Sequence, residues 1–196
     1  VSHPDKVYRD RTVDFFNQHI EAAVQLDCDH MVVSTGFAYL DVDAEDAFGW
    51  CAEAMGRIAR KAEQEGVTLA VEPFTKYTTH ICNEASQLRR LLRTVNSPRL
   101  TGLADTDVIA TTAVDTFSTF LDVIGPENLG HVHFVDGNPG GHLVPGDGVL
   151  DLDGALEKLK AIHYTGALGL EVLDRRYVFA PEAAMKQAMD WYKERI

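Results

Sequence analysis

Residues 46–72 read DAFGWCAEAMGRIARKAEQEGVTLAVE and form the clearest structural unit in the chain. Apolar side chains recur at helical spacing in the first part, which predicts an amphipathic helix that is capped by Asp43 or Asp46 and stops at Gly66. The run that follows is apolar and β-branched, as in a buried parallel strand, and it ends in a carboxylate, Glu72. The stretch is therefore a helix followed by a strand that presents an acidic side chain at its end.

The same unit recurs on both sides of this stretch. Strands are predicted over residues 31–33, 67–72, 100–104, 131–135 and 167–173. Further helices are predicted within 7–26, after a cap at Asn83, around 114–124, after a cap at Asp151 or Asp153, and from Pro181 onward. Strands that alternate with helices in this way specify a parallel α/β fold.

Two architectures fit this alternation, an open doubly wound sheet and a closed barrel. An open dinucleotide-binding sheet carries GxGxxG between its first strand and helix, and the sequence has no such turn. Polar side chains instead follow several successive strands, as they do around the mouth of a TIM barrel. The predicted fold is therefore an α/β (β/α)₈ TIM barrel, of which this chain covers about the last five βα units.

The length predicts how much of that barrel is present. Five strands in 196 residues are three fewer than a complete barrel of roughly 250 residues contains. We therefore expect residues 1–196 to form a single α/β-barrel domain that lacks the amino-terminal βα units. Because an incomplete barrel exposes two sheet edges, we also expect a homo-oligomer or a partner that supplies the missing strands.

Composition excludes several classes of protein. The chain has 30 acidic and 18 basic residues, a net charge of -12, and no basic run, which argues against nucleic acid as a partner. No apolar stretch approaches the roughly 20 residues that a membrane span needs, so no membrane association and a cytoplasmic location are expected. Cys28, Cys51 and Cys82 form no CxxC pair and are predicted to be buried thiols.

Four polar residues at the ends of different predicted strands form the candidate site: Glu72, Asp105, His133 and Glu171. Three carboxylates and one imidazole suit Mn²⁺, Mg²⁺ or Co²⁺, whereas zinc usually recruits more His or Cys. Asp107 is the alternative to Asp105, because a shift of two residues along a strand keeps the same face. We predict one bound divalent ion, with Mn²⁺ as the first choice.

Four stretches make the hypothesis more specific: LAVEPF (residues 69–74), TGLADTDV, GHVHFVDGNPGGHLVPGDGVLDL and YTGALGLEVL. In order and spacing they resemble the last four strands of the xylose-isomerase-like superfamily, most closely its ketose 3-epimerases. That branch includes D-tagatose, D-psicose and fructoselysine 3-epimerases. The most diagnostic part is H-x-H followed by P-G-x-G, here His131, His133, Pro145, Gly146 and Gly148.

The resemblance implies an isomerase that acts on a small carbohydrate or a sugar conjugate. It implies that Glu72, Asp105, His133 and Glu171 bind the metal. Glu72 and Glu171 are further expected to transfer protons on opposite faces of the substrate carbon, through a metal-stabilised enediolate. Two groups are needed because inversion removes a proton from one face and returns a proton to the other.

The sequence departs from the hexulose epimerases at two positions. Val108 stands where they commonly carry a histidine three residues after the metal-binding aspartate. An arginine that they place shortly before P-G-x-G is absent, and His142 stands nearby. The loop therefore looks more like the fructoselysine epimerase branch, and the departures weaken the expectation of a free hexulose as substrate.

Other residues near the predicted mouth are weaker candidates. His80, His142 and Asp136 are predicted to bind substrate, although each can equally be a solvated loop residue. His131 faces the same side as His133 and is predicted to support a ligand from behind, with ligation or simple packing as alternatives. Trp50 and Trp191 are predicted to pack helices on the barrel.

Two other functions fit the same residues. One is the metal-binding subunit of a C-glycoside deglycosidase, a lyase that also removes a proton beside a keto group. The other is a non-catalytic sugar-binding barrel. The sequence leaves the sugar, the physiological metal and the number of subunits open.

Overall fold

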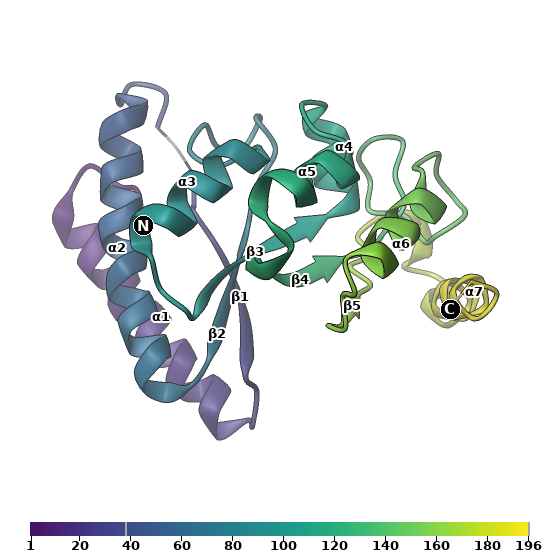
Figure 1. Cartoon of the computed structure of the whole chain (residues 1–196), viewed down its shortest axis with the longest axis horizontal. Helices are drawn as coiled ribbons and strands as arrows, with labels where there is room; N and C mark the ends of the chain where they lie inside the picture. Colours follow the sequence, from purple (N-terminus) through teal and green to yellow (C-terminus); the bar gives the residue numbers. More distant parts are fainter. Residues whose placement is uncertain (38, 196) are drawn as a thin grey trace.

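The computed structural model describes residues 1–37 and 39–195 and contains a parallel sheet in the order β1-β2-β3-β4-β5 (Figure 1). In these described residues the strands are β1 (His30–Ser34), β2 (Thr68–Glu72), β3 (Leu100–Asp105), β4 (Leu129–His133) and β5 (Leu168–Gly169). The helices are α1 (Lys6–Gln25), α2 (Ala44–Glu65), α3 (Ala85–Val95), α4 (Thr106–Thr112), α5 (Phe117–Ile124), α6 (Leu152–Ala161) and α7 (Pro181–Lys193). Short 3₁₀ turns cover Pro126–Asn128 and Arg175–Tyr177. Sequential parallel strands joined by helices confirm the predicted partial barrel.

Helix α2 forms as predicted, and the structure selects its cap. The Asp43 side chain accepts hydrogen bonds from the N–H groups of Glu45 and Asp46, and Gly66 ends the helix in the left-handed conformation at φ 77°. Asp151 likewise caps α6, and Pro181 lies in the first turn of α7. The capping rules therefore identify both ends of α2 and the start of two later helices.

The two faces of the sheet differ in chemistry. Leu69 and Val71 of β2, together with Val132 of β4, pack into one continuous apolar core with the inner faces of α1, α2, α3 and α5. The alternate positions point to the opposite face, which carries Glu72 and His133 at the ends of their strands. Alternation therefore separates the core side chains from the polar ones.

The register brings the polar strand ends to one edge. Ser34 pairs with Glu72, Asp105 pairs with His133, and His133 pairs with Gly169. Because the strands are parallel, their carboxyl ends meet at the same side of the sheet. Side chains from β2, β3, β4 and the segment after β5 can therefore converge there.

Several sequence predictions were wrong in detail. The last strand covers only Leu168–Gly169 instead of 167–173, because Leu173 bonds through its N–H to the His142 carbonyl in a loop and not to a strand. Strand β4 ends at His133, two residues early, because the Thr106 hydroxyl accepts the N–H of Val135. Helix α4 was not predicted, since Asp105 both ends a strand and caps the next helix.

Two further predictions need correction. Asn83 does not cap α3, whose cap position is Glu84. The Asn83 side chain instead donates to the carbonyls of Phe74 and Thr79, at 2.8 and 2.7 Å. Cys28 is exposed, because it follows α1 in a polar turn, whereas the other two cysteines are buried as predicted.

Trp191 packs its helix against the residue that follows β4, as predicted, whereas Trp50 contacts another helix. The Trp191 ring of α7 lies 6.0 Å from that of Phe134, which follows β4, and Trp50 of α2 faces the Arg9 guanidinium of α1 at 5.1 Å. Among the described residues, no helix has the length and apolar character that crossing a membrane requires.

Candidate metal centre

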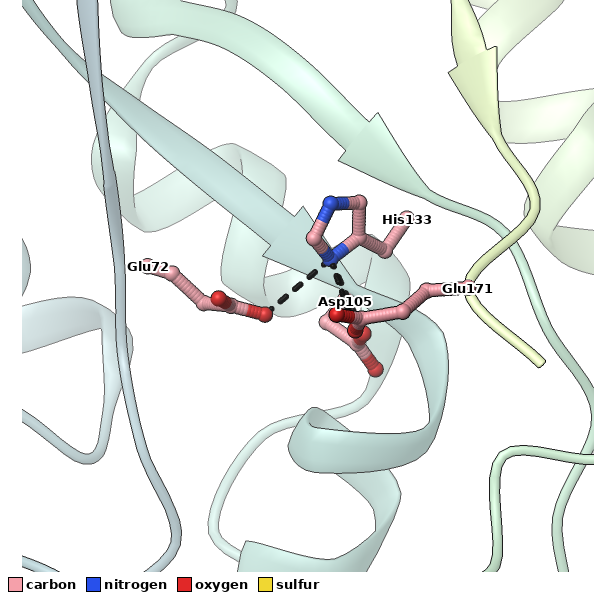
Figure 2. Close-up of side chains that lie close together, drawn as sticks. All are labelled: Glu72, Asp105, His133 and Glu171. Atoms are coloured by element: carbon pink, nitrogen blue, oxygen red, sulfur yellow. Dashed lines mark hydrogen bonds and ion pairs between the residues drawn. The ribbon is translucent and has the colours of Figure 1, made fainter. Parts of the chain in front are cut away.

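Four side chains from four successive strand ends converge on one point (Figure 2). They are Glu72, Asp105, His133 and Glu171, and one ligand atom from each lies within 4.8 Å of the others. Glu72, Asp105 and His133 are the last residues of β2, β3 and β4, and Glu171 follows β5 by two residues. The structure thus brings together all four residues that the sequence singled out as metal ligands.

The His133 imidazole lies at the centre of the cluster. Its Nδ1 is 3.1 Å from Glu72 Oε1, 3.2 Å from Glu171 Oε2 and 3.5 Å from Asp105 Oδ2. Figure 2 shows that Glu72 and Glu171 reach this nitrogen from opposite sides. One carboxylate oxygen from each of the three acidic residues therefore lies within 3.5 Å of His133 Nδ1.

The two oxygens of Asp105 have different surroundings. Oδ1 accepts the N–H groups of Asp107 and Val108, both at 2.8 Å, and so caps α4. Oδ2 is buried and has no hydrogen-bond partner among the described residues, although the imidazole nitrogens of His133 and His142 lie 3.5 and 3.3 Å away. A buried carboxylate oxygen without a donor needs a positive partner.

A hard divalent cation fits this donor set. Three carboxylates supply the oxygen ligands that Mn²⁺ and Mg²⁺ prefer, and one imidazole is compatible with Mn²⁺ and Co²⁺. The Oδ2 of Asp105, which accepts no hydrogen bond in the described chain, gives such an ion an anionic ligand. The chemistry of these residues therefore matches the metal site that the sequence predicts.

The charges of the cluster shift its proton equilibria strongly. Burial alone would lower the pKa of His133, but the carboxylates of Asp105, Glu171 and Glu72 outweigh it and raise that pKa to about 11. Burial would raise the pKa of Asp105, but its contacts with His133 and His142 lower it to about 2. In the metal-free protein at neutral pH, a protonated His133 imidazole therefore lies beside the ionised carboxylate of Asp105.

Metal binding should therefore release a proton and tighten as the pH rises. Below its pKa of about 11, His133 carries a proton on the nitrogen that a metal ion needs, so each ion must displace it. Between pH 6 and 9 we expect affinity to rise by about tenfold per pH unit, because one proton is released per ion. Calorimetric titration with Mn²⁺ in buffers of different ionisation enthalpy measures the proton release. An affinity independent of pH would contradict this assignment of His133.

His142 lies at the edge of the cluster, in the loop after β4. Its Nε2 is 3.3 Å from Asp105 Oδ2 and 3.5 Å from Glu171 Oε2. Its Nδ1 is 2.9 Å from Asp107 Oδ2. Burial would lower its pKa, but Asp105 and Asp107 outweigh burial and raise it to about 10. The predicted substrate-binding position of His142 is thus beside two of the four cluster residues.

The other predicted residues have no hydrogen bond or ion pair with the four cluster residues in the described chain. The carboxylate of Asp136 accepts the N–H groups of Gly137, Gly146, Gly148 and Leu150 and so holds the P-G-x-G turn. The ring of His131 lies 5.3 Å from that of His133, at right angles to it. No hydrogen bond or ion pair joins His80 to the cluster in the described part of the chain. Their roles in binding stay predictions.

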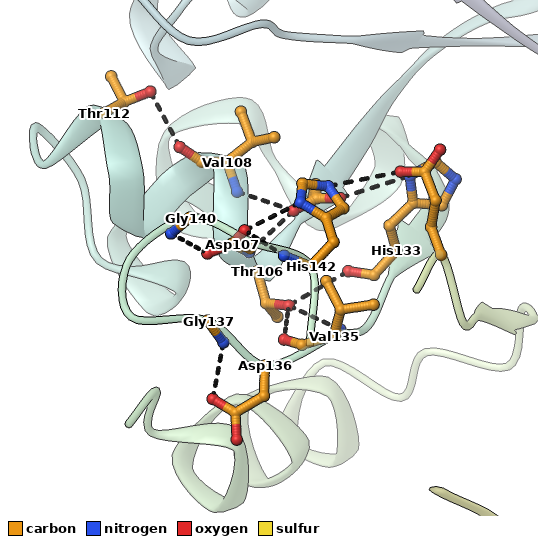
Figure 3. A network of polar contacts seen from close by, with 12 residues as sticks. Thr106, Asp107, Val108, Thr112, His133, Val135, Asp136, Gly137, Gly140 and His142 are labelled. Carbon is orange, nitrogen blue, oxygen red and sulfur yellow. Dashed lines mark hydrogen bonds and ion pairs between the residues drawn. The ribbon is translucent and has the colours of Figure 1, made fainter. Parts of the chain in front are cut away.

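Sequence reasoning considered Asp107 only as a substitute ligand and missed its contacts. Asp105 lies in the cluster, and Asp107 faces the loop of residues 137–142 instead (Figure 3). The sequence GNPGGH is rich in glycine and too short and polar for a helix or strand, so it indicates a tight loop. This pattern was the one sequence feature that pointed to a loop needing a side-chain partner.

Comparison with known proteins agrees with this architecture. Residues 1–195 match the family described as the xylose isomerase-like TIM barrel. This chain belongs to that family. The predicted fold class and superfamily are therefore confirmed.

Relatives within the family are sugar epimerases. Fructoselysine 3-epimerase of Shigella flexneri is 26% identical over 191 residues, which cover 96% of this chain and 68% of the relative. Ketose 3-epimerase of Arthrobacter globiformis is 30% identical over 118 residues, 60% of this chain and 39% of the relative. Since epimerases are isomerases, the predicted enzyme class is confirmed at the level of the family.

A solved structure shows the same fold. The apo crystal structure of 3-keto-D-glucoside 4-epimerase from E. coli superimposes with a TM-score of 0.87 at 19% identity. The match covers 98% of this chain and 74% of that protein. At this identity the similarity establishes the shared fold.

Proposed function

We propose that this chain carries the metal-binding and proton-transferring residues of a ketose 3-epimerase. The observation that supports this most is the convergence of Glu72, Asp105, His133 and Glu171 within 4.8 Å at four strand ends. The resemblance to fructoselysine 3-epimerase and ketose 3-epimerase supplies the reaction class. The proposal extends their activity to this chain.

Glu72 and Glu171 form the acid-base pair in this proposal. Inversion of a carbon beside a ketone removes its proton on one face and delivers a proton on the other. One glutamate accepts the C3 proton while the other, protonated, returns a proton to the opposite face, and the roles exchange in the reverse direction. Their approach from opposite sides of His133 supports this division of labour (Figure 2).

The four cluster residues would hold one divalent ion, Mn²⁺ first and Mg²⁺ or Co²⁺ as alternatives. When bound, such an ion supplies Lewis-acid polarisation of the substrate carbonyl, which makes the neighbouring proton easier to remove. His133 would contribute Nδ1, and Asp105 would contribute the buried Oδ2, which accepts no hydrogen bond in the described chain. The two glutamates are thereby oriented toward the substrate carbon.

The substrate is a ketose or, as a more specific proposal, a ketose conjugate. Glu72, Asp105 and Glu171 place three carboxylates in the cluster, whereas Asp107 is buried behind His142. With a net charge of -12, the chain as a whole disfavours a phosphorylated sugar and tolerates a neutral or amine-bearing one. The similarity to a fructoselysine 3-epimerase points in the same direction.

Proton exchange in D₂O tests the proposed function. The metal-loaded protein should incorporate deuterium at C3 and interconvert epimers of fructoselysine, or of D-fructose and D-psicose, as observed by NMR. Cleavage of a 3-keto C-glycoside without epimerisation would favour a C-glycoside deglycosidase subunit. Tight sugar binding without exchange would favour a non-catalytic barrel.

We further propose that an additional segment or subunit covers the β1 edge, and that the protein works in the cytoplasm. β1 pairs only with β2 within the described residues, and Val32 on it is 42% exposed. The chain spans 68% of the length of its fructoselysine 3-epimerase relatives.

The residues of this chain alone should consequently unfold at low temperature or associate, because an open parallel edge is costly. Size-exclusion chromatography and thermal unfolding of residues 1–196 measure both properties. A monomer that unfolds cooperatively at high temperature would contradict the proposal of a missing cover.

A further inference from the structure

The loop of residues 137–142, GNPGGH, is built around one buried carboxylate, that of Asp107 (Figure 3). Asp107 Oδ1 accepts the N–H of Gly140 at 2.5 Å, and Oδ2 accepts the N–H of His142 at 3.0 Å. A Cβ at position 137 would collide with Asp107 Oδ1, so only glycine fits there. Asp107 itself is 1% exposed. The shape of the loop therefore depends on this side chain.

His142 is held by Asp107 at two places. The same Oδ2 that accepts its backbone N–H lies 2.9 Å from its ring nitrogen Nδ1. The residue adopts φ 48°, in the left-handed region that costs energy for a side chain of this size. Its carbonyl in turn accepts the N–H of Leu173, in the segment that carries Glu171. Backbone and ring are therefore both fixed.

The remaining ring nitrogen faces the metal centre. Nε2 lies 3.3 Å from Asp105 Oδ2 and 3.5 Å from Glu171 Oε2. The imidazole thus bridges the buried Asp107 and the side of the cluster on which Glu171 lies. A rotated ring would lose the contact with Asp107 and withdraw Nε2 from that side.

We propose that Asp107 is a positioning residue that fixes the ring of His142, so that Nε2 binds a substrate hydroxyl beside Glu171. The contact to a hydroxyl rests on the proposed function, whereas the positioning of the ring does not. Outer groups that orient active-site residues typically change metal affinity or activity by about 10–100-fold when they are replaced.

Nuclear magnetic resonance of the Mg²⁺-loaded protein, labelled with ¹⁵N-histidine, tests the positioning directly. A Nδ1 proton that bonds to a buried carboxylate should give a downfield signal, and His142→Asn identifies it by its loss. We expect Asp107→Asn to remove or shift this signal. Its persistence unchanged in Asp107→Asn would overturn the proposal.

A double-mutant cycle tests whether Asp107 acts through His142. Asp107→Asn should lower kcat/KM for the ketose about 10–100-fold in the wild-type background and less than about twofold in the His142→Asn background. Asparagine is chosen at position 142 because it tolerates a positive φ. An equal loss in both backgrounds would overturn the proposal.

Tyr177→Phe is the matched control for loop stability. The Tyr177 hydroxyl accepts the N–H of Val144 and donates to Asp147, so its removal loosens the chain just after the loop without touching His142. The His142 ring signal should stay unchanged in this variant, and its loss would overturn the assignment to Asp107. Failure of every ketose to react would reject the proposed function, while the ring signal in Asp107→Asn would still decide the positioning.

Discussion

Replacing Glu72 or Glu171 by glutamine should abolish epimerisation, with a loss of at least about 10²–10⁴-fold in kcat. Glutamine keeps an oxygen for the metal but cannot accept a proton from carbon. We therefore expect a large loss of kcat and only a small change in the free energy of unfolding. The Glu72 side chain is 11% exposed and the Glu171 side chain is 38% exposed, so solvent should reach the proton on Glu171 more easily. The measurement is the rate of epimer interconversion after metal content has been matched.

The two variants should also differ from each other. If the glutamates serve opposite faces, each variant should retain deuterium exchange with only one of the two substrate epimers. Glu65→Gln is the control, because Glu65 ends α2 and pairs with Lys61 far from the cluster. Inversion at a near-wild-type rate in Glu72→Gln or Glu171→Gln would remove that residue from the acid-base role.

The fold was predictable because local signals and the tertiary structure agree along most of the chain. The apolar spacing of α2, its Asp43 cap and the left-handed Gly66 all specify the same element. The length of the last strand was overestimated, because an apolar run predicts a strand whether or not a neighbouring strand is there to pair with it. Leu173 bonds to the His142 carbonyl, a contact that depends on a loop 31 residues earlier.

The four cluster residues were predictable because each ends a strand, and parallel strands bring their ends together. The contacts of Asp107 were not predictable, because they depend on how the loop of residues 137–142 folds back onto α4. Sequence spacing places Asp105 and Asp107 on the same face of a strand, but the chain turns into α4 immediately after Asp105. That turn directs Asp105 Oδ2 to the metal centre and Asp107 to the loop.

Asp105→Asn should weaken binding of Mn²⁺ by more than about 100-fold. Loss of an outer partner alone costs about 10–100-fold, and here an anionic ligand itself becomes neutral. Asparagine can still cap α4 through the oxygen that bonds to the N–H groups of Asp107 and Val108. The variant should therefore fold, and the loss should arise at Oδ2.

The same substitution should also lower the stability of the metal-free protein. The pKa of Asp105 is about 2 in the folded chain, below its ordinary value, so its ionised form stabilises the fold above pH 4 and this contribution is lost as the pH falls toward 2. At pH 7 we expect Asp105→Asn to lower the free energy of unfolding by about 2 kcal/mol. Asp43→Asn, at the cap of α2, is the matched control: it should leave Mn²⁺ affinity within about twofold of wild type. Chemical denaturation and calorimetric titration of both variants measure these effects, and undiminished Mn²⁺ affinity in Asp105→Asn would exclude Oδ2 as a ligand.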